Sequence, residues 1–297
     1  MINFLCKSCV RVLNNDIIKV FNFIMYLKNK KLLKIFFLVF FICFPKNISA
    51  QNIQNIYIPC EIEKCKPEWG PTNTRWYKGD GDKKKPAIIW YGGGKGNYTS
   101  ADNQPINQLL GKFDIIVVAS PFELFSDHRT QGMPQYVNDE NLIFRMRHAT
   151  EHYKKILNKP IWLGGISSGG VRVIATISGK DRFSDNYAGL IFSSTYVSRI
   201  WQGSPQYINL ESDIKYEMNL PILVFQHARD MKPQQQPYLQ EWFTKGLAKK
   251  NLNKTELILT TEGDPMITTH DGGHHWFQYN KEEVARVVEK FIMENSK

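Results

Sequence analysis

Short apolar runs alternate along the chain with longer stretches in which apolar residues recur at helical spacing. The apolar runs predict strands, and the stretches with a period near 3.6 residues predict amphipathic helices. Strands that are apolar along their length are typical of a parallel sheet that is buried on both faces. The predicted strands are 86–94, 113–120, 160–166, 187–194, 220–228 and 255–261, and the predicted helices are 138–157, 168–179, 237–251 and 281–295.

This alternation predicts an α/β fold, in which a mainly parallel sheet is flanked by helices on both faces. Residues 51–297 contain no internal repeat and no low-complexity linker, so they are predicted to form a single domain. The longest stretch without a predicted element is 195–218. Because long connections in compact domains are often functional, we expect this stretch to form a small cap.

The first 50 residues carry an export pattern. A basic stretch (28–35) precedes an uncharged apolar stretch (36–44), and small residues ending at Ala50 resemble a cleavage site. This is the order of a secretory signal peptide, and the apolar stretch is far shorter than the ~20 residues that a spanning helix needs. We expect cleavage near Ala50 and a secreted or periplasmic protein, with Met25 as the alternative start. If uncleaved, this N-terminal segment would be the protein's contact with a membrane.

The net charge of +10 does not point to a nucleic-acid partner. Residues 1–50 hold eight basic residues and one acidic residue, a net of +7, which leaves 30 basic against 27 acidic residues in 51–297. A nucleic-acid-binding domain would need a basic surface that this near balance does not supply.

Cysteine usage agrees with export. Beyond the N-terminal segment only Cys60 and Cys65 remain, and an even pair in an exported chain suggests a disulfide. The loop it would close is short, which places its stabilisation at the low end of roughly 2–4 kcal/mol. A metal pair is the weaker alternative, because no second Cys/His pair stands nearby in the sequence.

Residues 165–169 read GISSG, which fits the pattern G-x-S-x-G. The pattern follows a predicted strand and precedes a predicted helix, the setting in which a sharp turn projects a nucleophilic serine from the edge of a sheet. Side chains at Gly165 and Gly169 would crowd the neighbouring strand and helix. We therefore predict that Ser167 is a nucleophile; an ordinary glycine-rich loop is the alternative.

A serine nucleophile needs a base, and the base needs an orienting carboxylate. In this setting they follow the serine in the order Asp/Glu and then His. Asp230 comes directly after the predicted strand 220–228, and His274 follows two glycines where a tight turn can bring an imidazole back over the sheet. The weaker alternatives are His275 and His270 for the base, and Asp264 and Asp271 for the carboxylate.

Backbone N–H groups near the serine could stabilise the oxyanion of an acyl-transfer reaction. Ser168, the residue after the nucleophile, supplies one candidate, and Gly93 or Gly94 in the glycine run that ends the predicted strand 86–94 supplies the second. This run has neither the P-loop spacing nor a dinucleotide fingerprint. The four His and Asp residues of HDGGHH are too closely spaced to converge easily on a tetrahedral metal. We expect no metal and no cofactor.

The motifs WYGGG, GISSGG, FQHARD and DGGHHWF occur in an order that resembles the α/β-hydrolase family over roughly residues 84–296. GISSGG is similar to the elbow of dienelactone-hydrolase-like and prolyl-oligopeptidase-like members. Tyr91 departs from the pattern, since many relatives have His ahead of the glycines. The resemblance implies a serine hydrolase, most simply a carboxylic-ester hydrolase acting on a small-molecule or lipid ester, and the N-terminal pattern adds that it is exported. A prolyl-oligopeptidase-like peptidase and a non-catalytic binding module on the same fold are the alternatives.

Overall fold

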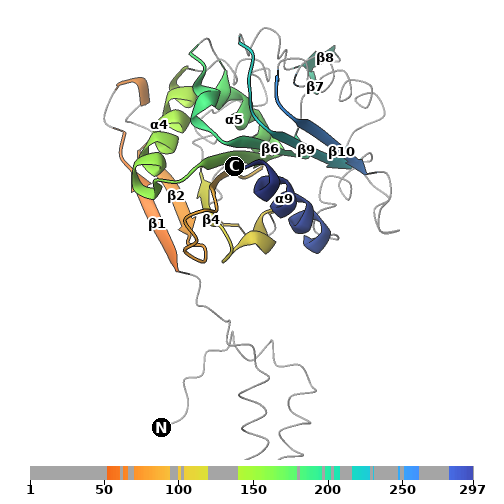
Figure 1. Ribbon diagram of the computed structural model, residues 1–297. Coiled ribbons are helices and arrows are strands. Elements are labelled where there is room, and N and C mark those ends of the chain that lie inside the picture. The colour runs from red at the N-terminus through yellow and green to blue at the C-terminus, as the bar shows by residue number, and fades with distance from the viewer. Residues whose placement is uncertain are drawn as a thin grey trace, which may run out of the picture. The chain divides into compact units, whose positions relative to one another are not determined.

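A twisted sheet of eight strands forms the centre of the computed structural model (Figure 1). The structure describes residues 52–60, 63–65, 70–93, 100–101, 104–119, 140–178, 181–195, 198–201, 204–207, 216–227, 230, 247, 251–260 and 281–296. By its internal contacts the chain divides into Met1–Ala50 and Gln51–Lys297, and all described residues belong to the second unit. That this unit is one catalytic domain stays a prediction.

The strands follow the order β1-β2-β4-β3-β5-β6-β9-β10 across the sheet. All neighbours from β4 to β10 run parallel, whereas β1 and β2 are antiparallel additions at one edge. The strands are β1 Ile53–Ile58, β2 Thr72–Tyr77, β3 Ala87–Tyr91, β4 Asp114–Val118, β5 Ile161–Ile166, β6 Gly189–Ser193, β9 Ile222–His227 and β10 Thr255–Thr260. The predicted α/β fold with a mainly parallel sheet is therefore confirmed.

Of the three α-helices in the described part of the chain, two lie in connections between parallel strands, and the third follows β10. The α-helices are α4 Glu140–Leu157, α5 Ser168–Ile177 and α9 Lys281–Asn295, and the short 3-10 turns are η1 Glu63–Cys65, η3 Asn107–Leu109 and η5 Phe183–Asn186. The predicted strands and three of the predicted helices agree with these elements to within a few residues. The fourth predicted helix, 237–251, lies almost wholly outside the described residues. Within 195–218, β7 (Ser198–Trp201) and β8 (Ser204–Tyr207) form a separate antiparallel pair.

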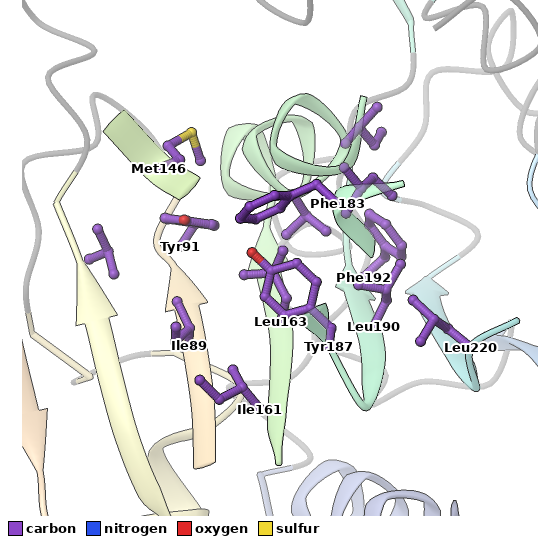
Figure 2. Packing of buried hydrophobic residues seen from close by; sticks show 14 of the residues in the cluster. Ile89, Tyr91, Met146, Ile161, Leu163, Phe183, Tyr187, Leu190, Phe192 and Leu220 are labelled. Carbon is purple, nitrogen blue, oxygen red and sulfur yellow. The ribbon is translucent and has the colours of Figure 1, made fainter. Parts of the chain in front are cut away.

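Two apolar cores cover the two faces of the sheet. On β3, Ile89 and Tyr91 face the core beneath α4 and α5, in a cluster that also holds Met146 and Leu163 (Figure 2). The intervening residues of the strands face the opposite core, where Trp162 meets Phe291 of α9 edge to face at 5.9 Å between ring centroids. Side chains alternate along a strand, so uniformly apolar strands require helices on both sides. The sheet is therefore buried on both faces, and its strands hold the loops that follow them at one edge.

A buried ion pair joins the start of β4 to the turn before β5. The Asp114 carboxylate accepts hydrogen bonds from Lys159 Nζ at 2.6 Å, Trp76 Nε1 at 3.0 Å and the Gly79 N–H at 3.1 Å. Burial acts to raise the pKa of Asp114, but these three donors and the Lys159 charge outweigh it and hold the pKa below its ordinary value.

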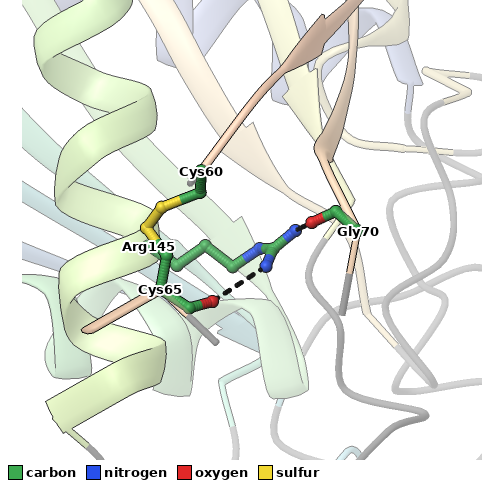
Figure 3. Close-up of a disulfide and its surroundings, with 4 residues drawn as sticks. All are labelled: Cys60, Cys65, Gly70 and Arg145. Carbon is green, nitrogen blue, oxygen red and sulfur yellow. Dashed lines mark hydrogen bonds between the residues drawn. A yellow bond between two sulfur atoms is a disulfide. The ribbon is translucent and has the colours of Figure 1, made fainter. Parts of the chain in front are cut away.

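The segment between β1 and β2 is anchored to α4. Cys60 and Cys65 lie in disulfide geometry with their Cα atoms 5.6 Å apart, and Arg145 reaches from α4 to the carbonyl oxygens of Cys65 and Gly70 (Figure 3). His148 of the same helix brings a ring nitrogen within 4.8 Å of both sulfur atoms. Folding thus supplies the nearby histidine that the sequence around the cysteines lacks.

Among the described residues, no helix combines the length and the apolar character needed to cross a membrane.

Candidate active site

Ser167 lies at the junction of β5 and α5 in a strained backbone conformation. Its φ of 56° and ψ of −125° are rarely adopted by residues other than glycine. Hydrogen bonds hold the turn from both sides, because the Ser167 N–H donates to Ser193 O at 3.0 Å and the Gly170 N–H donates to Ser167 O at 3.1 Å. Such strain costs about 1–3 kcal/mol and persists where the surrounding structure enforces it, frequently at active sites.

The glycines around Ser167 allow three backbone segments to approach closely. A Cβ atom at Gly165 would lie 2.5 Å from the Gly169 carbonyl, and one at Gly169 would lie 2.0 Å from the carbonyl oxygen of Tyr91. Both distances are far shorter than real Cβ contacts. The crowding expected from the sequence is therefore present, and the end of β3 rests directly on the first turn of α5.

The Ser167 side chain does not serve the helix that it precedes. A serine before a helix usually accepts a hydrogen bond from a backbone N–H of the first turn, yet Ser167 Oγ makes no such cap. The residue is only 7% exposed. A structural capping role therefore does not account for a serine in this strained position.

Gly93, two residues after the end of the neighbouring strand β3, lies against Ser167. A Cβ atom at Gly93 would stand 3.0 Å from Ser167 Cβ and 3.6 Å from Ser167 Oγ. Ser168 is the first residue of α5, whose N-terminal N–H groups favour developing negative charge. The structure thus brings Ser167, Ser168 and Gly93 together, whereas Gly94 lies outside the described residues.

Asp230 follows the carboxyl end of β9 and is fully buried. Ser193 of β6 is paired with Ile166 of β5 on one side and with Phe225 of β9 on the other, so the three strands end at the same edge of the sheet. The Asp230 carboxylate accepts a hydrogen bond from the side-chain amide of Gln226. The candidate bases and the alternative carboxylates lie outside the described residues: His270, His274, His275, Asp264 and Asp271.

Two residues near this edge were missed by the sequence interpretation. Arg172 on α5 is 1% exposed and donates from Nη1 to the Gly92 carbonyl oxygen at 2.6 Å. Burial lowers the pKa of Arg172 to about 9, although the nearby Tyr91 acts to raise it. Gln226, which holds Asp230, sits within an apolar strand. In each case a long polar side chain in a buried, largely apolar element was the available signal.

Tyr91 does not reach into the site. Its side chain is buried in the core beneath α4 and α5 (Figure 2), and burial raises the pKa of its phenol. Where many relatives have a histidine, this chain thus has a tyrosine that packs into the core directly before the glycine run.

Several solved structures share the fold. A prolyl endopeptidase aligns with a TM-score of 0.55 and 12% identity, over 82% of this chain and 38% of its own. The carboxylesterase EstE1, cloned from a metagenomic library, aligns with a TM-score of 0.52 and 11% identity, over 82% of this chain and 89% of its own. Est1E from Butyrivibrio proteoclasticus, with bound ferulic acid, aligns with a TM-score of 0.51 and 16% identity, over 80% and 99%.

The chain has the α/β-hydrolase fold. It spans less than two fifths of the length of the prolyl endopeptidase that it resembles. No protein-family model matches the chain, and no curated protein matches it. The α/β-hydrolase fold hosts many activities, so at these identities the activity has to be argued from the site.

Proposed function

We propose that the protein is a serine hydrolase that cleaves carboxylic esters through an acyl-enzyme. The observation that carries the proposal is the conformation of Ser167. It is held in a strained turn against Gly93, and its hydroxyl does not cap the helix that follows. A turn of this kind has a cost in stability that a purely structural connection would avoid. The resemblance in fold to the carboxylesterase EstE1 over 89% of that chain supports the same activity.

The reaction assigns one task to each residue. Ser167 Oγ attacks the ester carbonyl carbon while His274 takes the hydroxyl proton, and the buried Asp230 holds the imidazole tautomer. The N–H groups of Ser168 and of Gly93 or Gly94 stabilise the oxyanion. Collapse of the intermediate breaks the bond to the leaving alcohol, which takes the proton from the imidazolium. Water then attacks the acyl-enzyme with the same imidazole as base, which releases the acid and restores Ser167.

We further propose that the chain is exported after cleavage near Ala50, so that its substrate is an extracytoplasmic small-molecule or lipid ester. The N-terminal order of basic, apolar and small residues supports this. The disulfide geometry of Cys60 and Cys65 agrees with an oxidising compartment.

A peptidase is the second candidate, because the chain also resembles a prolyl endopeptidase in fold. Nitrophenyl esters of increasing acyl length should be assayed beside aminoacyl nitroanilides. We expect turnover of esters well above that of anilides, and a loss of at least about 10³-fold in kcat in Ser167→Ala, because triad members act as a unit. Faster cleavage of the anilides would establish the peptidase instead. No turnover of either class by the folded protein would favour a binding module.

A further inference from the structure

Arg172 is a charged side chain in a helix that is largely apolar and buried. Residues Gly169 to Ile177 of α5 are all buried, and Arg172 is the charged residue among them. Burying a guanidinium is costly unless its hydrogen bonds are made within the protein. A residue of this kind, one helical turn after the nucleophile, calls for an explanation in terms of what it binds.

The Arg172 guanidinium binds the backbone of the glycine run. Its Nη1 donates to the carbonyl oxygen of Gly92 at 2.6 Å, in a contact buried from solvent. The same oxygen lies 2.8 Å from the position that a Cβ at Gly169 would occupy, which places it over the first turn of α5. Side chains on a helix lean toward its N-terminus, so Arg172 reaches this oxygen along the surface of its own helix.

The direction of the Gly92 carbonyl fixes the direction of the next N–H. The peptide between Gly92 and Gly93 is planar and trans, since the described residues contain no cis peptide bond. In a trans peptide the C=O and the N–H point in opposite directions. With the carbonyl turned toward Arg172, the Gly93 N–H points away from it, and Gly93 itself lies against Ser167.

We propose that Arg172 is a positioning residue for the oxyanion hole, because it clamps the Gly92 carbonyl and thereby aims the Gly93 N–H at the carbonyl oxygen of the substrate. The inference rests on the proposed function and deepens it. It also gives the glycine run a rigid support on one side, since glycine residues alone would leave that backbone free to rotate. The clamp acts through a backbone group and does not itself touch the substrate.

Arg145 provides a matched control. It is 2% exposed, it also donates to backbone carbonyl oxygens, and it lies on α4 beside Cys65 and Gly70. Arg145→Met should lower the melting temperature and leave kcat within about threefold of wild type. Arg172→Met should lower kcat by about 10–100-fold with KM nearly unchanged, because removal of an oxyanion donor costs about 10²–10³ in kcat and a misaimed donor should cost less.

A boronic acid supplies a second readout, because its tetrahedral adduct with Ser167 places an oxygen where the oxyanion forms. Its affinity should fall in Arg172→Met by about the factor lost in kcat, and Arg172→Lys should recover part of both losses. If Arg172→Met does not fold, Arg172→Gln, whose amide is too short to reach Gly92, takes its place in both measurements.

The outcomes separate the two proposals. Wild-type kcat and boronate affinity in a folded Arg172→Met or Arg172→Gln variant, with wild-type protein that hydrolyses esters, would overturn the clamp and leave the proposed function intact. An equal loss of kcat in Arg145→Met would also overturn it, since the effect would then belong to any buried arginine. Absence of hydrolysis in the folded wild type would overturn the proposed function, and the clamp with it.

Discussion

At the scale of single residues, Ser167 combines a conformational cost with a hydroxyl that does not cap the helix it precedes. Hydrogen bonds to β6 and α5 hold its backbone at a positive φ. The surrounding structure therefore maintains the strained conformation. Asp230 is buried at the end of the second strand along from β5 and is held by Gln226. A buried carboxylate in that position suits a residue that must orient an imidazole.

The strand, turn and helix around Ser167 were predictable from sequence because the motif is local, whereas the role of Ser167 stays a prediction. The strand, the turn and the helix around Ser167 are contiguous, so residues 165–169 carry the whole signal. The clamp from Arg172 to Gly92 joins positions 80 residues apart, and no short pattern records it. The contact of Gly93 with Ser167 likewise depends on the pairing of β3 with β5.

At the scale of elements, the parallel strands were predictable because their apolar runs are continuous and buried on both faces. The antiparallel strands β1 and β2 were not. β2 mixes exposed and partly buried positions with buried ones, and β1 is largely exposed at the edge of the sheet. An edge strand of that kind carries a weak apolar signal, which the pattern of hydrophobic residues does not separate from a loop.

The buried ion pair between Asp114 at the start of β4 and Lys159 just before β5 gives a prediction about stability. Because the folded pKa of Asp114 lies below its unfolded value, its charge stabilises the fold above the unfolded pKa, and this stabilisation is lost as pH falls through the folded pKa. Asp114→Asn should therefore lower the free energy of unfolding at pH 7 by about 1–3 kcal/mol.

The wild type and Asp114→Asn should converge as the pH is lowered below 4. Urea unfolding of both proteins at pH 7 and along a series down to pH 3 measures this. Lys85→Met, which removes an exposed pair with Asp80, is the control and should change stability little at any pH. A difference for Asp114→Asn that stayed constant with pH would show that the carboxylate charge does not contribute.

At the scale of the whole molecule, the two cores on either side of the sheet support a common edge at which Ser167 and Asp230 stand. The contacts of Arg145 tie the Cys60–Cys65 loop to α4, which belongs to the core beneath that edge. If the protein is exported, Cys60 and Cys65 are expected to form a disulfide. The competing hypothesis is a metal site formed by the two thiols and His148.

We predict that Cys60 and Cys65 of purified, unreduced protein resist alkylation until a reductant is added. Reduction should lower the unfolding free energy by about 2 kcal/mol, the low end expected for a short loop. Mass spectrometry after alkylation, together with total zinc content, decides between the hypotheses. Rapid alkylation of both thiols without reductant, or one zinc per chain that is lost in His148→Ala, would contradict the disulfide.

The central claim is that Ser167 is the nucleophile of a Ser–His–Asp triad. A fluorophosphonate probe, followed by peptide mapping, tests it most directly because the probe reacts covalently with activated serines. We predict one labelled residue, Ser167, and no label in Ser167→Ala. His274→Gln should label about as poorly as Ser167→Ala, while His275→Gln and His270→Gln label nearly as well as wild type, with thermal melts confirming the fold of each. A folded wild type that takes no label, or a label that persists in Ser167→Ala, would contradict the claim.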